Sequence, residues 1–161
     1  YDYFFSIFPH CWGWATWSDR WLKFDDSMKL WPKIKKENLN FFFRSNSKFK
    51  KYWLARFDSV YNREIDSWAT IWTYSLWSNK MLTCAPPVNM GFNQGFGFSG
   101  RKDGTHSKIS IQKNLKEYIF CKLPPKIIYC EKNDKYDQDT NYQPNILRRI
   151  SRKILRRRLF L

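Results

Sequence analysis

Residues 10–17 read His10-Cys11-Trp12-Gly13-Trp14-Ala15-Thr16-Trp17 and hold three of the nine tryptophans in the chain. With Trp21, the tryptophans at 14 and 17 stand at positions i, i+3 and i+7, which is the spacing of one helical face. The spacing predicts a helix that begins near Gly13 and ends near Asp25 and Asp26.

The segments on either side of this motif predict short strands and further helices. Residues 1–9 are aromatic and β-prone, which predicts a strand or buried extended arm that turns at Pro9. Apolar residues at helical spacing predict one helix over 50–62 and another over 67–79. The second helix has Asp66 or Ser67 as its N-cap. Its expected buried stripe is Trp68, Ile71, Trp72 and Leu76. A short strand is expected over residues 81–84.

Length and composition indicate one globular domain with a strong positive charge. The chain has 161 residues, 43% of them hydrophobic and 27% charged, with a net charge of +15. These values exclude wholesale disorder. No apolar run reaches the roughly 18 residues that a membrane-spanning helix needs, and no basic region precedes the first apolar stretch as in a signal peptide. The start of the sequence suggests a chain entered in mid-domain.

Aromatic residues are unusually frequent, with nine Trp, nine Tyr and fourteen Phe making 20% of the chain. All the tryptophans lie between positions 12 and 77. A buried indole N–H needs a hydrogen-bond partner, so this density suits a large core, a cleft in which sugars stack, or both. Core packing accounts for most of them.

The four cysteines contain no C-x-x-C pair, and the chain has only two histidines. A zinc site needs closer pairs than this. We therefore expect free thiols in a reducing compartment.

The second half of the chain is organised differently from the first. Residues 91–100 are rich in glycine and predict a loop that leads to Thr105 and His106. Such a loop can approach a phosphate or a metal closely, or lie on the surface without a role. Residues 126–145 predict a polar linker. Residues 146–161 carry seven cations and no acid among apolar residues, which predicts a basic amphipathic helix.

The motif at 10–17 resembles the H-x-W-G-W-A-T-W signature in the second half of a group of bacterial glycosyltransferases. These enzymes are related to glycosyltransferase family 2. Three further segments agree in order and spacing, over about residues 1–110. They are the aromatic strand Tyr3-Phe4-Phe5-Ser6, a helix of S-W-x-x-x-W type with Ser67-Trp68-Ala69, Trp72 and Trp77, and a closing N-x-G-F…T-H loop with Asn93, Gly95, Phe96, Thr105 and His106.

The resemblance implies an α/β fold, the C-terminal, acceptor-side half of a GT-A nucleotide-diphospho-sugar transferase domain. That half would span residues 1–125, with the linker and the basic C-terminal helix after it. The family's nucleotide-binding half, with its Asp-x-Asp metal motif, is absent from this sequence. The Asp-x-Asp at 137–139 lies in the expected linker and is not that motif. We therefore expect an inactive fragment in isolation and an exposed apolar surface.

The resemblance also implies a set of site residues. The catalytic base is Asp66, with Asp19 as a competitor, and the metal ligand is His106. The substrate-binding residues are Trp12, Gly13, Trp14, Trp17, Asn93, Gly95 and Thr105. Some relatives have Asp where this chain has Ala69, and others have Asp two residues before the tryptophan, as Asp66 is here. The loop over 97–105 is longer than the family's compact form.

The implied activity is transfer of a sugar from a nucleotide-diphospho-sugar to a saccharide or lipid-linked acceptor in surface polysaccharide synthesis. The cofactor is a divalent metal, Mn²⁺ or Mg²⁺, held mostly by the absent N-terminal half. The basic helix implies contact with an anionic membrane, so the expected location is cytoplasmic and peripheral to the inner membrane. Two alternatives remain. One is a non-catalytic transferase remnant or interaction module, and the other is a basic nucleic-acid-binding protein.

Overall fold

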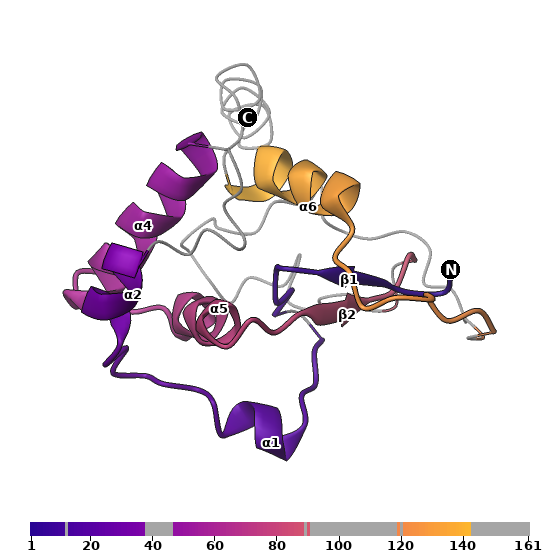
Figure 1. Ribbon diagram of the computed structural model, residues 1–161, viewed down its shortest axis with the longest axis horizontal. Helices are drawn as coiled ribbons and strands as arrows, with labels where there is room; N and C mark the ends of the chain where they lie inside the picture. The colour runs from indigo at the N-terminus through magenta and orange to yellow at the C-terminus, as the bar shows by residue number, and fades with distance from the viewer. Residues whose placement is uncertain (12, 38–46, 89, 91–118, 120, 143–161) are drawn as a thin grey trace, which may run out of the picture.

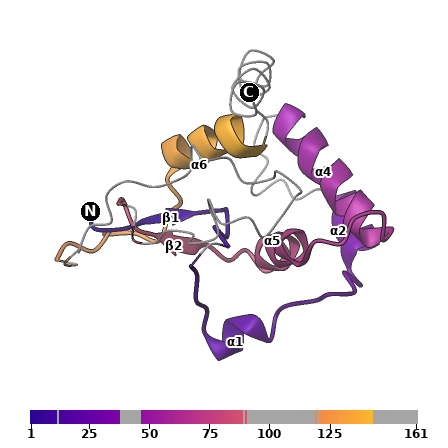
Figure 2. The same cartoon turned by 180° about the vertical axis from the view of Figure 1, so that it is seen from behind.

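The computed structural model describes residues 1–11, 13–37, 47–88, 90, 119 and 121–142. Within these residues the protein is a mixed structure of helices and one small sheet (Figure 1). The helices α4 and α5 lie on one side of the strand pair, and α6 and α1 lie at opposite edges of the molecule (Figures 1 and 2). Its membership of a GT-A fold stays a prediction.

The sheet is built around the aromatic strand near the beginning of the chain. Strand β1 (Phe4–Ser6) pairs antiparallel with β2 (Thr83–Ala85), and Phe5 lies opposite Cys84. Phe5 also forms a parallel bridge with Tyr129, and its carbonyl accepts a hydrogen bond of 2.7 Å from the Cys130 amide. The strands expected near Phe4 and over 81–84 are thus both present.

Two long helices form most of the core. Helix α4 (Ser47–Tyr61) and helix α5 (Trp68–Ser78) confirm the helices predicted over 50–62 and 67–79. The Ser67 hydroxyl caps α5 by accepting from the Thr70 amide at 3.4 Å. Residues 70–77 are buried without a break, which is the pattern of a central helix covered on all sides.

Aromatic residues fill the core, as the composition predicts. The largest fully buried side chains are Trp31, Trp77, Tyr74, Phe8 and Phe57. Their polar atoms have partners: the Trp77 indole N–H donates to the Ile7 carbonyl at 2.7 Å, and the Trp31 indole N–H donates to Asp58 at 3.0 Å. Burying one such side chain stabilises the fold by roughly 1.5–3 kcal/mol, and the indole hydrogen bonds prevent a desolvation penalty.

The helix predicted from Gly13 to Asp26 is wrong in its extent. Only one turn forms, α1 (Ser18–Trp21), and α2 (Trp31–Glu37) follows after an irregular segment. Gly13 has φ +61° and Trp17 is extended, so the chain before Ser18 is not helical. Aromatic contacts of Trp14 with α5 override the helical spacing here. The segment nevertheless packs against α5, as expected for its helix.

The polar linker predicted over 126–145 is also wrong for its central part. Residues 131–142 form α6 (Glu131–Asp137) and the π-helical turn η2 (Gln138–Tyr142). Asp134 and Gln138 are buried because they bind other elements: Ser6 donates to Asp134, and Trp53 donates to Gln138 at 3.2 Å. A polar sequence can form a packed helix when its buried polar groups find such partners.

Two further expectations concern the whole chain. The four cysteines, all within the described residues, are free thiols, as their spacing predicts. Among the described residues, none of the helices has both the length and the apolar character needed to cross a bilayer.

Candidate functional site

Five aromatic side chains from three parts of the chain meet beside the first turn of α5, and we call them the tryptophan cluster. Its members are Trp14, Trp21, Phe24, Trp68 and Trp72. Trp14 stacks on Trp68 with ring centroids 5.8 Å apart and lies 5.6 Å from Trp72. Trp21 stacks on Phe24 at 4.9 Å and reaches Trp72 at 5.5 Å. One continuous aromatic surface results.

Part of this cluster faces solvent. Trp72 is only 3% exposed and forms the floor, whereas Trp68 is 47% and Trp21 is 44% exposed. Trp17, at the N-cap of α1, is 73% exposed beside the cluster in sequence. Contiguous exposed aromatic surface of this kind marks a binding site or an interface far more often than isolated exposed apolar residues do.

Three local structures place the rings together. Trp68 is the first residue of α5, and Trp72 follows four residues later on the same helical face. Trp21 is the last residue of α1. Trp14 is directed to this place by the left-handed turn at Gly13, where φ is +61° and glycine has no steric penalty.

The expected positions of three tryptophans are corrected by this arrangement. Core packing was expected for most tryptophans, and Trp68 was expected in the buried stripe of its helix, but Trp17, Trp21 and Trp68 are all exposed. Ile71, Trp72 and Leu76 are buried as predicted. Trp68 differs because it stands at the very start of α5, where the helix projects beyond the core.

Asp66, the predicted catalytic base, is exposed and lies two residues before Trp68. It is not the cap of α5, because the Ser67 hydroxyl takes that role and also lies 2.9 Å from the Thr70 hydroxyl. Arg56 donates to the same Thr70 hydroxyl at 3.3 Å. Asp66 is therefore an exposed carboxylate, two residues before Trp68 in sequence, that does not cap the helix.

Asp19, the competing base, lies on α1 and is also exposed. It forms an ion pair with the neighbouring Arg20 at 3.4 Å, and both side chains face solvent. An exposed pair of this kind contributes little to stability. The carboxylate of Asp19 is thus already paired with a cation, and Asp66 remains the preferred candidate.

Burial raises the pKa of two further groups among the described residues. It raises the pKa of the partly buried Cys11 thiol, which lowers the fraction of reactive thiolate near neutral pH. Burial raises the pKa of Tyr74 to about 12, and the nearby charge of Asp25 adds to this effect. Neither group therefore supplies acid–base chemistry near neutral pH.

The remaining predicted site residues lie outside the described residues. They are Trp12, Asn93, Gly95, Thr105 and His106. The predicted return of Thr105 and His106 toward the Trp12–Trp14 turn stays a prediction. Within the described part of the chain, no group of three His, Cys, Asp or Glu side chains is arranged to hold a metal ion. His106, the metal ligand predicted for this chain, lies outside the described residues, so the metal part of the hypothesis stays a prediction.

Comparison with known proteins gives no assignment: no family model, no curated protein and no solved structure matches this chain. The site must be interpreted from its own residues. These residues form a half-exposed aromatic platform, and an exposed carboxylate, Asp66, lies two residues before Trp68 in sequence.

Proposed function

We propose that this chain is the acceptor-side part of a glycosyltransferase that moves a sugar from a nucleotide-diphospho-sugar to a saccharide or lipid-linked acceptor. The product would belong to a surface polysaccharide. The stacked and half-exposed Trp14–Trp68 pair beside Asp66 carries this proposal. The signature at 10–17 supports it independently through its resemblance to glycosyltransferases.

The platform suits a saccharide because a pyranose ring has a flat face of C–H groups. An indole offers a large apolar face and a polar N–H, and little side-chain entropy is lost when a ligand covers it. Trp14 contacts both Trp68 and the buried Trp72, so the platform is preformed. Trp17 and the turn at Gly13 extend it, and Gly13 leaves open space because a Cβ there would meet nothing within 4 Å.

Asp66 would act as general base. A sugar stacked on Trp68 places a hydroxyl near the residues just before α5, and a carboxylate there takes the proton as the hydroxyl attacks the donor sugar. A divalent metal, Mn²⁺ or Mg²⁺, would neutralise the leaving diphosphate. His106 is the only ligand this chain is predicted to supply, so the nucleotide and most of the metal would be held by a separate nucleotide-binding half.

Location and membrane contact follow from the basic segment over 146–161. We place the protein in the cytoplasm, peripheral to the inner membrane, with anionic lipid as a partner. A lipid-linked acceptor would meet the platform at such a surface. This segment lies outside the described residues, and the membrane contact stays a prediction.

Mutation of the two competing carboxylates tests the proposal in the gene product that carries this chain. Turnover is measured as nucleoside diphosphate released from a panel of nucleotide-diphospho-sugars with saccharide acceptors. We expect Asp66→Asn to lower turnover by about 10²–10⁴-fold, the typical contribution of a general base. Asp19→Asn is the matched control, and it should retain turnover.

The outcomes separate the candidates clearly. Full turnover in Asp66→Asn together with a loss in Asp19→Asn would move the base to α1. Full turnover in both variants would remove the exposed carboxylates from the mechanism. Absence of turnover with every donor would favour the non-catalytic alternative.

A further inference from the structure

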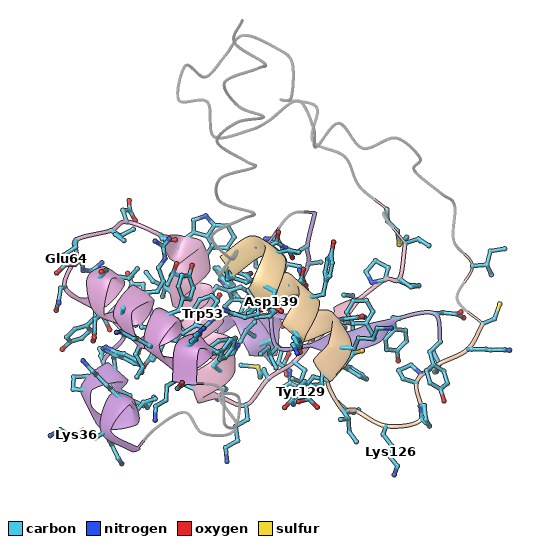
Figure 3. The ribbon with its side chains drawn as sticks, turned by 90° about the horizontal axis from the view of Figure 1, so that it is seen from above. Lys36, Trp53, Glu64, Lys126, Tyr129 and Asp139 are labelled. Carbon is cyan, nitrogen blue, oxygen red and sulfur yellow. The ribbon has the colours of Figure 1, made fainter. Side chains whose placement is uncertain are left out.

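A second group of polar side chains lies where the end of β1 meets α6, away from the tryptophan cluster. The Ser6 hydroxyl donates to Asp134 Oδ1 at 2.6 Å, and His10 Nε2 lies 3.2 Å from the same hydroxyl oxygen. His10 Nε2 is also 3.5 Å from Asp137 Oδ2. Figure 3, seen from above, shows α6 lying across β1, with Asp139 at the end of the α6–η2 segment nearer to Trp53.

The hydrogen bonds of this group define which of its atoms carry the hydrogens and which accept them. Ser6 is fully buried and uses its hydroxyl hydrogen on Asp134, so its oxygen only accepts from other partners. It accepts from the Phe8 amide at 3.0 Å. While Asp134 is ionised, His10 therefore donates to Ser6 through an Nε2–H, and the chain of donors runs from His10 through Ser6 to Asp134.

Asp134 is an unusual residue to bury. It is 5% exposed, and its other oxygen accepts from the Ile7 amide at 3.2 Å. Burial raises the pKa of Asp134, whereas the hydrogen bonds from Ser6 and Ile7 and the charge of a protonated His10 lower it. A buried carboxylate is retained only where such partners stabilise it, so the geometry of residues 6–10 and of α6 depends on this group.

The same residues begin the segment that carries Trp14. His10 has φ +47°, a left-handed conformation that is uncommon for a residue other than glycine and persists only where its surroundings fix it. Ile7 is held from the opposite side, because its carbonyl accepts from the Trp77 indole at 2.7 Å. Three residues after His10, the turn at Gly13 leads into Trp14. The path of this segment is therefore set at His10.

We propose that His10 is a positioning residue for the saccharide platform: its imidazole, bound to Ser6 and paired with Asp137, sets the path of the segment that presents Trp14 to the cluster. This inference rests on the proposed function. It assigns a role in substrate binding to α6, a helix that does not touch the platform.

The side chain of His10 is flanked by polar groups of α6 and η2. The carboxylates that face it are Asp134 and Asp137, and its other neighbours are Ser6 and the Phe8 ring at 6.4 Å. Tyr142 of η2 lies near the same two carboxylates, and burial raises the pKa of its phenol. A side chain that can donate a hydrogen bond from the position of Nε2 is therefore what this place requires.

The experiment observes Trp14 directly and needs no saccharide. The full chain is labelled with 5-fluorotryptophan, and the fluorine resonances of Trp14 and Trp68 are assigned with Trp14→Phe and Trp68→Phe. All variants are compared at one pH. We expect His10→Ala, which removes the donor to the Ser6 hydroxyl, to shift the Trp14 resonance away from its wild-type position.

His10→Gln keeps a donor for Ser6, so its Trp14 resonance should return toward the wild-type position. Asp139→Asn changes an exposed carboxylate just beyond α6; it is the matched control and should match the wild type. If His10→Ala does not fold, Asp137→Asn serves instead, because it removes the carboxylate paired with His10 and should also displace the Trp14 resonance.

A Trp14 resonance that is unchanged in His10→Ala, or that is displaced as far in His10→Gln as in His10→Ala, would overturn the positioning role. Saccharide binding is measured separately on the same proteins. A displaced Trp14 resonance in His10→Ala, together with no saccharide binding by the wild type, would overturn the proposed function and leave the coupling of His10 to Trp14 intact.

Discussion

Individual residues show most clearly where local pattern and tertiary contact disagree. Trp68 and Trp72 have the i, i+4 spacing of a buried stripe, yet Trp72 is the floor of the cluster and Trp68 is half-exposed. Spacing places both rings on one helical face, but it does not reveal where the core ends along the helix axis. Ser67, in contrast, could be named from sequence as a cap of α5, because capping is a local effect.

Tyr74 provides a test of the core at the same scale. Burial, with the charge of Asp25, raises its pKa to about 12. Below pH ~10, the ordinary tyrosine value, the phenol is neutral in both folded and unfolded chains and its stabilisation is fully present. As pH rises toward about 12, the unfolded chain ionises first and the folded state loses stability.

Denaturant unfolding between pH 9 and 12 measures this effect against Tyr74→Phe, which cannot ionise at this position. We expect the free energy of unfolding to fall less steeply with pH in the variant than in the wild type. Tyr52 and Tyr142, whose pKa values burial also raises, are present in both proteins and cancel in the comparison. Equal slopes would mean that Tyr74 ionises as readily in the folded chain as in the unfolded one.

Helices and strands could be predicted where apolar residues recur at a regular spacing over many positions. They could not be predicted where burial depends on hydrogen bonds between polar residues that are distant in sequence. The helices α4 and α5 follow from their spacing, as do the short strands near Phe4 and Thr83. Helix α6 could not be predicted, because its buried face contains Asp134 and its neighbour in η2 contains Gln138. These residues are buried only because Ser6 and Trp53 lie far away in sequence and close in space.

The basic segment over 146–161 is the element that remains to be tested. Each Lys or Arg near an anionic membrane contributes roughly 1 kcal/mol, so seven cations should give reversible, salt-sensitive binding. In vesicle co-sedimentation at low salt, we expect the full chain to bind anionic vesicles and a chain lacking residues 146–161 to be released. Neutral vesicles are the control and should bind little. Equal binding of both chains would show that the segment is a solvated tail.

At the scale of the whole molecule, a second group of exposed apolar side chains lies among the described residues. The segment beside β1 loops away from the helices through Lys126 (Figure 3). Its exposed apolar residues are Ile119, Leu123, Ile127 and Ile128. That they belong to the exposed surface expected of a half-domain stays a prediction. The gathering of four tryptophans with Phe24 was not predictable from the sequence, because it depends on how distant segments pack.

Saccharide binding by the tryptophan cluster tests the central claim most directly. The full chain is applied to a saccharide array and to single-stranded oligo-dT, and affinities for the bound saccharides are then measured by titration calorimetry. We predict binding of at least one saccharide, weakened about tenfold or more, or about 1.4 kcal/mol, in Trp14→Ala combined with Trp68→Ala. Tyr136→Ala removes an exposed aromatic ring from α6 and should bind like the wild type. Equal saccharide binding in the double variant, no saccharide bound by the wild type, or binding of oligo-dT alone would contradict the account.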